Sequence, residues 1–134
     1  MGLLEAAKHC MSHWITFSGR APRSEYWWFT LFAVLLNLAL QIVSGMAMSQ
    51  GGAIAILALM AAYLLVSIFL GIAGISAAVR RLHDKDRSGW WYWIMLVPVV
   101  GVILLLVWFC QRGTQGPNRF GPDPLMGIDA EVFA

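Results

Sequence analysis

The stretch AIAILALMAAYLLVSIFLGIAGISAAV at residues 53–79 decides what kind of fold this chain can form. It has no charged residue. A helix needs about 20 residues to cross a hydrocarbon core about 30 Å thick, and this stretch is longer than that. Two further apolar stretches of spanning length occupy residues 27–48 and 90–110. The pattern predicts an all-α integral membrane protein with three transmembrane helices.

The composition indicates that lipid is the solvent for most of the chain. Of the 134 residues, 60% are hydrophobic and 12% are charged, and the mean hydropathy is +0.71. Soluble domains carry about 25% charged residues. Nine Lys and Arg against seven Asp and Glu form no long basic run that could follow a phosphate backbone, so nucleic acid is not an expected partner. The length indicates a single membrane domain, residues 1–134.

The distribution of lysine and arginine sets the expected orientation. Seven of them fall before the first span, at residues 1–26, and on the link at residues 80–89; none falls on the link SQGG at residues 49–52, and two fall on the tail at residues 111–134. With three spans, the positive-inside rule places the N-terminus and the charged link in the cytoplasm and the tail outside. Cys10 and Cys110 would then lie on opposite faces and could not form a disulfide.

The N-terminal segment, residues 1–19, has a helical pattern that is too short and too polar to span a membrane. Its apolar residues form one stripe, Leu3, Ala7, Met11, Trp14 and Ile15. Such an amphipathic helix lies in the plane of the membrane interface. At the other end, GTQGPNRFGPDP at residues 113–124 is rich in Gly and Pro and predicts a loop.

Small and polar residues inside the first two spans favour helix packing, because lipid provides no hydrophobic drive between helices. The residues expected to contact a neighbouring helix are Asn37, Gln41, Ser67, Gly71, Gly74 and Ala78. In the third span, Pro98 and Gly101 predict a kink. No span contains Asp, Glu, Lys, Arg or His, which argues against a proton-driven transporter and leaves an oligomeric pore or small transporter as an alternative function.

Two charged segments border the spans on the expected cytoplasmic side, GRAPRSEYWWF at residues 19–29 and RRLHDKDRSGWWYW at residues 80–93. Both combine arginines and carboxylates with Trp and Tyr, which prefer the headgroup level. They are either interfacial anchors or a basic collar that binds anionic lipid headgroups or a membrane-protein partner. The residues of such a collar are Arg20, Arg23, Glu25, Tyr26, Trp27, Arg80, Arg81, His83, Asp84, Arg87, Trp90 and Trp91.

Enzyme and metal chemistry have little support in the sequence. The acid and base of a lipid-headgroup enzyme would be His83 and Asp84, but adjacent residues on a helix do not face each other. A metal site could use His9, His13 and His83, although no spacing typical of a zinc motif is present. We therefore predict a non-enzymatic membrane accessory or scaffold without a catalytic residue, a cofactor or a metal. Its expected partners are membrane lipids and either another membrane protein or further copies of the chain.

Three motifs occur in the order GRAPRSEYWWF, RRLHDKDRSGWW and NRFGPDP, the last at residues 118–124. Together they resemble the bacterial inner-membrane family catalogued as domain of unknown function 805, over roughly residues 17–124. The resemblance implies a small polytopic protein of the bacterial cytoplasmic membrane and no established activity. If all three motifs form one site, NRFGPDP must reach the cytoplasmic face, which three spans forbid unless one apolar stretch is re-entrant or the second is broken.

Overall fold

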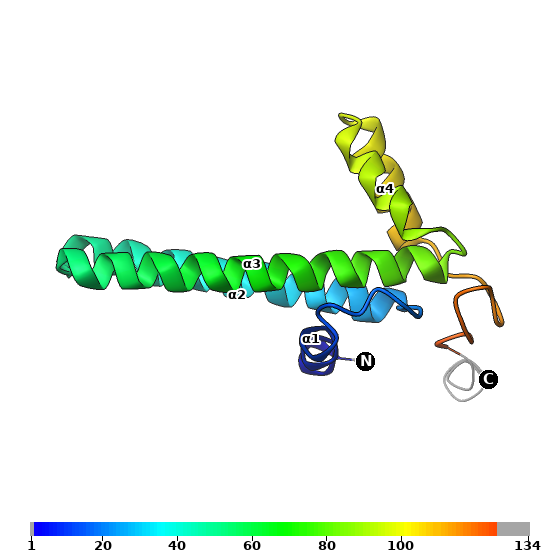
Figure 1. Cartoon of the computed structure of the whole chain (residues 1–134), viewed down its shortest axis with the longest axis horizontal. Helices are drawn as coiled ribbons and strands as arrows, with labels where there is room; N and C mark the ends of the chain where they lie inside the picture. Colours follow the sequence, from blue (N-terminus) through cyan, green and yellow to red (C-terminus); the bar gives the residue numbers. More distant parts are fainter. Residues whose placement is uncertain (1, 126–134) are drawn as a thin grey trace.

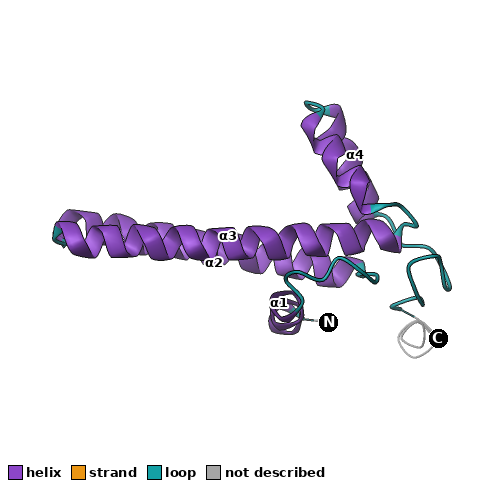
Figure 2. Cartoon of the chain, viewed as in Figure 1, coloured by secondary structure: helices purple, strands orange, loops and turns teal. Residues whose placement is uncertain are grey.

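The computed structural model describes residues 2–125, and this part of the chain is helical and contains no strand, as Figure 2 shows. The elements are α1 (Leu3–Ser12), α2 (Arg23–Gln50), α3 (Ala53–Asp84), the 3₁₀-helix η1 (Gly89–Leu96) and α4 (Val100–Cys110). α2 and α3 form a long antiparallel pair, α1 lies across it on one side, and η1 and α4 project from the other side (Figure 1). The all-α class is confirmed. Residues 126–134 of the expected tail lie outside the described residues.

α2 and α3 are the two helices of spanning length. At about 1.5 Å per residue, the 28 residues of α2 extend about 42 Å and the 32 residues of α3 extend about 48 Å. Both lengths exceed the thickness of a hydrocarbon core, which is about 30 Å. Their most apolar windows have mean hydropathies of 2.0 and 2.7. Large apolar side chains on both helices are uncovered, such as Ile42 at 63% and Ile54 at 85% exposure. This uncovered apolar surface is suited to lipid.

α1 is the amphipathic helix expected at the N-terminus, but its apolar face packs largely on protein. Its buried residues are Ala6, Ala7 and Cys10. Trp14, just after the helix, packs against Phe69 of α3 with ring centroids 5.2 Å apart. The Ser76 hydroxyl of α3 donates to the carbonyl of Thr16 at 2.5 Å and lies 3.1 Å from the carbonyl of His13. The segment after α1 is therefore fastened to α3.

The third apolar stretch is not a single transmembrane helix. η1 leads away from the end of α3, the chain reverses at residues 97–99, and α4 returns beside η1 (Figure 1). Pro98 has no N–H to continue a helix, and Val99 takes a φ of 64°, which β-branched residues rarely adopt. A Cβ at position 101 would lie 1.6 Å from the carbonyl oxygen of Ile94, so Gly101 is required for the close return. The expected kink is a reversal.

Several backbone N–H and carbonyl groups at the reversal form hydrogen bonds with one another. The N–H of Val97 donates to the carbonyl of Ile94 at 3.0 Å, and that of Val100 donates to Pro98 at 2.7 Å. The N–H of Gly101 donates to the carbonyl of Val97 at 3.1 Å. Unpaired backbone groups are costly in lipid, where no water can replace the missing partner. The tip of the hairpin is thus compatible with apolar surroundings.

Both ends of the η1–α4 hairpin lie at the same end of the α2–α3 pair. Gly89 packs on Val79, since a Cβ at this glycine would lie 2.6 Å from the valine side chain. The carbonyl of Cys110 accepts a hydrogen bond from Arg23 at 3.1 Å. A straight helix over residues 90–110 would instead carry residue 110 about 30 Å away from this end, toward the α2–α3 turn. The third apolar stretch therefore does not form the single helix that was expected, and the structure does not separate the tail or Cys110 from the end that holds Cys10.

The polar residues of the first two spans form contacts between α2 and α3. Ser67 Oγ donates to Asn37 Oδ1 at 3.0 Å, and Gln41 Nε2 donates to Tyr63 Oη at 3.3 Å. In an apolar solvent such bonds fix the relative rotation of two helices.

The small residues of α3 border a groove. It has a volume of about 420 Å³, lies between the helix pair and Tyr92 of η1, and includes Gly71, Gly74 and Ala78 in its lining. A Cβ at Gly74 would lie 3.9 Å from Phe29, whereas one at Gly71 would meet no atom within 4 Å. Close helix contact thus involves the Gly74 end of the stripe, and Gly71 faces open space.

Candidate functional site

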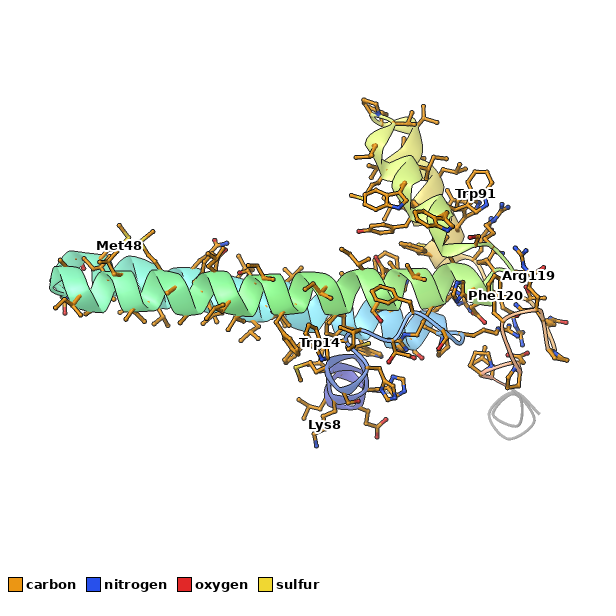
Figure 3. All side chains as sticks on the ribbon, in the orientation of Figure 1. Lys8, Trp14, Met48, Trp91, Arg119 and Phe120 are labelled. Carbon is orange, nitrogen blue, oxygen red and sulfur yellow. The ribbon has the colours of Figure 1, made fainter. Side chains whose placement is uncertain are left out.

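Charged motifs that are far apart in the sequence meet at one end of the α2–α3 pair. Arg119 and Phe120 lie beside the end of α3, Trp91 lies at the base of the η1–α4 hairpin, and Met48 lies toward the opposite end of the molecule (Figure 3). We call this region the charged end; it comprises residues 20–27, 80–87 and 109–123. Residues 80–84, expected in a link, are the last turn of α3. The fold therefore unites the three motifs that three spans would have separated.

Asp84 is the centre of one buried ion-pair cluster. Its Oδ1 lies 2.8 Å from Arg20 Nη2 and its Oδ2 lies 2.5 Å from Arg81 Nη1. The three side chains are at most 4% exposed, and charges so deeply buried persist only when paired and hydrogen-bonded. Arg20 also donates to the carbonyls of Thr114 at 2.5 Å and Gly116 at 2.7 Å. The cluster thus ties α3 to the tail.

The C-terminal end of α4 is held by side chains of α2 and α3. The last carbonyls of a helix have no partner within it. Here Arg81 Nε donates to the carbonyl of Phe109 at 3.3 Å, and Trp27 Nε1 donates to the same carbonyl at 3.2 Å. Arg23 Nη1 donates to the next carbonyl, that of Cys110, at 3.1 Å. Cationic donors also interact favourably with the dipole at this end of a helix, so they stabilise the return of the hairpin.

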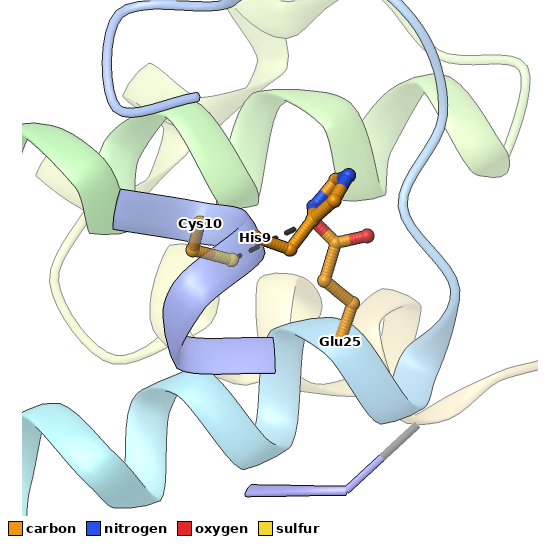
Figure 4. Close-up of side chains that lie close together, drawn as sticks. All are labelled: His9, Cys10 and Glu25. Atoms are coloured by element: carbon orange, nitrogen blue, oxygen red, sulfur yellow. Dashed lines mark hydrogen bonds and ion pairs between the residues drawn. The ribbon is translucent and has the colours of Figure 1, made fainter. Parts of the chain in front are cut away.

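Glu25 is the centre of a second buried cluster, which includes α1 (Figure 4). Its Oε1 accepts from Arg80 Nη1, lies 2.9 Å from His9 Nδ1 and accepts from Cys10 Sγ at 3.5 Å. Burial, with a smaller contribution from the charge of Glu25, raises the pKa of Cys10 to about 12. The thiol is therefore protonated and unreactive at neutral pH.

The second cluster does not fit a metal ion. Within residues 2–125, the group of potential ligands that converges is His9, Cys10 and Glu25, with ligand atoms within 4.8 Å of one another, and not the three histidines considered from the sequence. Arg80 already bonds to the carboxylate, and its Nη2 lies 3.8 Å from Cys10 Sγ. A guanidinium in this position repels a cation, and a protonated thiol is a poor ligand. The arrangement is an ion-pair cluster.

His83 and Asp84 do not form a catalytic pair. His83 Nδ1 lies 3.0 Å from the carbonyl oxygen of Gly19, and its ring stacks on Phe120 with centroids 4.0 Å apart. Asp84 instead belongs to the arginine cluster. Asn118 Nδ2 donates to the carbonyl of His83 at 2.9 Å, so the NRFGPDP motif is docked on this histidine. The role of His83 in the structure is to hold the tail.

Comparisons with known proteins agree with this set of motifs. A family model described as "Protein of unknown function (DUF805)" matches residues 14–122. The chain belongs to the DUF805 family. It is 38% identical over 117 residues to the inner membrane protein YhaI of Escherichia coli strain K12, which covers 87% of the chain and 92% of the relative. The inner membrane protein YhaH of that strain is 38% identical over 115 residues, covering 85% and 91%. No solved structure matches the chain.

In this DUF805 chain, the other collar residues lie at the periphery of the charged end. Arg23 is exposed and pairs with no carboxylate within residues 2–125. Arg87 is half-buried and also pairs with no carboxylate in this range; its guanidinium lies 4.1 Å from the ring centroid of Trp108 and 6.0 Å from that of Trp91. Trp90 is 78% exposed. Two arginines of the DUF805 motifs, Arg23 and Arg87, thus differ from Arg20, Arg80 and Arg81, which pair with buried carboxylates.

Some residues of the DUF805 site could not be identified from the sequence. Thr114 and Gly116 contribute backbone carbonyls to Arg20, and a backbone acceptor has no side-chain signature. Gly113 is required for another reason: a Cβ there would lie 2.0 Å from Asp84 Oδ2. The signal that did exist was the NRFGPDP motif, which indicated that the tail belongs with the arginines.

Proposed function

We propose that this DUF805 protein is a non-enzymatic accessory protein of the bacterial cytoplasmic membrane that binds anionic phospholipid headgroups at its charged end. The contacts with lipid are made by Arg23, Trp27, Arg87, Trp90 and Trp91. The buried residues Arg20, Glu25, Arg80, Arg81, His83 and Asp84 hold the fold. The names of YhaI and YhaH as inner membrane proteins support the location.

The observation that carries this proposal is the division of the arginines. The buried carboxylates of Glu25 and Asp84 are used internally, and two arginines share Asp84, so the charged end keeps an excess of positive charge. Among residues 2–125, Arg23 and Arg87 pair with no carboxylate, and both lie beside tryptophans. Tryptophan settles at the headgroup level, and each basic residue near an anionic surface adds about 1 kcal/mol to binding.

We also infer that the chain crosses the membrane twice, through α2 and α3, with η1 and α4 as a re-entrant hairpin. This topology is supported by the distribution of charge. It places all nine Lys and Arg toward the charged end and none at the turn Gly51–Gly52. The positive-inside rule then puts the charged end, with the segments before α2 and after α4, in the cytoplasm. Three spans would instead leave two of the nine outside.

Labelling of introduced cysteines is expected to distinguish two spans from three. In a Cys110→Ser background, Gln50→Cys places a thiol at the α2–α3 turn and Gln115→Cys places one in the tail, both at exposed positions. Cys10 should not react, because it is buried and its pKa is raised to about 12. In intact Escherichia coli spheroplasts, a membrane-impermeant maleimide is expected to label the Gln50→Cys variant alone. The Gln115→Cys variant should react after the membrane is opened; its labelling in intact spheroplasts would support three spans.

Lipid preference tests the proposed function directly. In non-ionic detergent, native mass spectrometry is expected to show several-fold tighter binding of phosphatidylglycerol than of phosphatidylcholine with the same acyl chains. The difference should shrink between about 0.05 and about 0.5 M salt, because salt screens exposed charges. The Arg23→Gln/Arg87→Gln double variant should lose the preference. The matched control is Arg119→Gln, since Arg119 is 61% exposed at the same end but pairs with Asp86 at 3.3 Å. Equal affinity of the unaltered protein for both lipids would refute the proposal.

An oligomeric pore or transporter has less support. The groove beside Gly71 is open, as a docking face would be. However, Asn37 and Gln41, which line it, already bond to Ser67 and Tyr63 within the helix pair. A conducting path needs polar groups that are free to coordinate water or an ion.

A further inference from the structure

We propose that a single anionic phospholipid binds in a slot on the outer side of α2, with its phosphate at Arg23 and an acyl chain running along the helix. The slot has a volume of about 480 Å³ and is lined by Arg23, Ser24, Trp27, Trp28, Leu31 and Cys110. This inference rests on the proposed function and deepens it by naming one site and the orientation of its ligand.

The lining of the slot changes from cationic to apolar along one face of α2. Arg23, Trp27 and Leu31 are four residues apart, so they stack in one row, and Ser24 and Trp28 form the neighbouring row. At about 1.5 Å per residue, the row from Arg23 to Leu31 covers about 12 Å. A phospholipid changes from polar to apolar in the same direction, with a phosphate followed by the glycerol esters and then by an acyl chain.

The Arg23 end of the slot, the cationic mouth, has hydrogen-bond donors that are available to a ligand. Arg23 Nη1 donates to the carbonyl of Cys110 at 3.1 Å, which positions the guanidinium. A guanidinium has five N–H donors, and Arg23 pairs with no carboxylate within residues 2–125. α2 begins after Pro22, which provides no side-chain cap, so the first-turn N–H groups near Ser24 add positive potential. A phosphate diester is the complementary ligand.

The apolar half of the slot, formed by Trp28 and Leu31, favours a lipid over a free phosphate ion. Trp28 is 41% and Leu31 is 43% exposed, directly below the cationic mouth. An inorganic phosphate would leave this apolar surface uncovered, whereas an acyl chain packs against it. Trp27 Nε1 is already bonded to the carbonyl of Phe109, so this residue presents its ring and not a donor to the ligand.

Single substitutions test the site by native mass spectrometry with phosphatidylglycerol as the probe. Arg23→Gln is expected to weaken binding of the first lipid about fivefold, the effect of one basic residue at an anionic surface. Arg119→Gln should leave that affinity unchanged. Trp28→Ala keeps the contact between Arg23 and Cys110 and tests the apolar half separately. It should weaken binding, whereas Trp93→Ala, which removes a tryptophan that is 56% exposed on η1, should not.

The thiol of Cys110 gives a second readout, because it lines the slot and is exposed. Phosphatidylglycerol is expected to slow its alkylation by iodoacetamide in the unaltered protein, and phosphatidylcholine to slow it less. The protection should be lost in both the Arg23→Gln and Trp28→Ala variants. Alkylation without added lipid serves as the baseline for each variant, so a change in the thiol itself is not counted as lost protection.

The possible failures are distinguishable. If the unaltered protein prefers phosphatidylglycerol but Arg23→Gln and Trp28→Ala retain both the affinity and the protection of Cys110, the slot is wrong and the proposed function survives with another site. If the unaltered protein shows no preference for the anionic lipid, the proposed function and the slot are both wrong.

Discussion

Asp84→Asn is expected to prevent the protein from accumulating in a folded form. The substitution leaves Arg20 and Arg81 buried, at 1% and 0% side-chain exposure, without the carboxylate that they share. Removing one partner of a buried ion pair costs about 3–5 kcal/mol. Whole domains are stable by only about 5–15 kcal/mol. The yield of monodisperse protein in mild detergent and its unfolding temperature measure the effect.

Asp86→Asn is the matched control for this prediction. Asp86 lies two positions further on and pairs with Arg119, but its side chain is 48% exposed and that of Arg119 is 61% exposed. Exposed pairs contribute about 0–1 kcal/mol, so this variant should behave like the unaltered protein. If Asp84→Asn and Asp86→Asn unfold at the same temperature, the buried cluster does not stabilise the charged end.

Gly101→Ala is expected to destabilise the protein, and the sign of the effect separates a hairpin from a straight helix. In the hairpin, the new Cβ would lie 1.6 Å from the carbonyl oxygen of Ile94, so η1 and α4 must separate. Overpacking of this kind costs about 1–3 kcal/mol or more. In a straight third span the same change would be favourable by about 0.8–1.0 kcal/mol, because alanine is the better helix former.

Gly71→Ala is the control, since a Cβ at Gly71 in α3 would meet no atom within 4 Å. Its unfolding temperature should equal or exceed that of the unaltered protein. An unfolding temperature for Gly101→Ala that rises as much as that of Gly71→Ala would contradict the hairpin. If Gly101→Ala lowers the unfolding temperature by separating η1 from α4, the variant is also expected to give water-soluble reagents more access to the ends of the hairpin.

The helices of spanning length could be predicted from the sequence because length and hydropathy are local properties. α2 and α3 follow from uncharged stretches that exceed the thickness of a hydrocarbon core, and α1 follows from its periodic pattern. The family could be identified because its motifs are long. Each of these inferences needs information from one segment only.

The hairpin could not be predicted in the same way, because residues 90–110 are long and apolar enough to span as one helix. Pro98 is compatible with a kink as well as with a reversal. What decides between them is a set of long-range bonds, in which Arg81 and Trp27 donate to the carbonyl of Phe109 and Arg23 donates to that of Cys110. These acceptors are backbone carbonyls, which every residue has, so the residue type does not indicate them.

The division of the arginines follows from helix geometry once α3 is known to continue to Asp84. Successive residues of a helix point about 100° apart, so Arg80 and Arg81 extend from different sides of α3. Arg81 and Asp84 are three residues apart on one face and meet the tail, whereas Arg80 meets Glu25. In a link, as the sequence predicts, all of these residues would be candidates for lipid binding.

α1, η1 and α4 all lie toward the charged end, whereas α2 and α3 alone reach the turn at Gly51 (Figure 1). With the proposed topology, the protein is a wedge whose cross-section is larger in the cytoplasmic leaflet than in the outer one. Each inserted molecule therefore displaces more lipid from the inner leaflet. The area mismatch between the leaflets, and with it the preferred curvature of the membrane, scales with the number of molecules inserted.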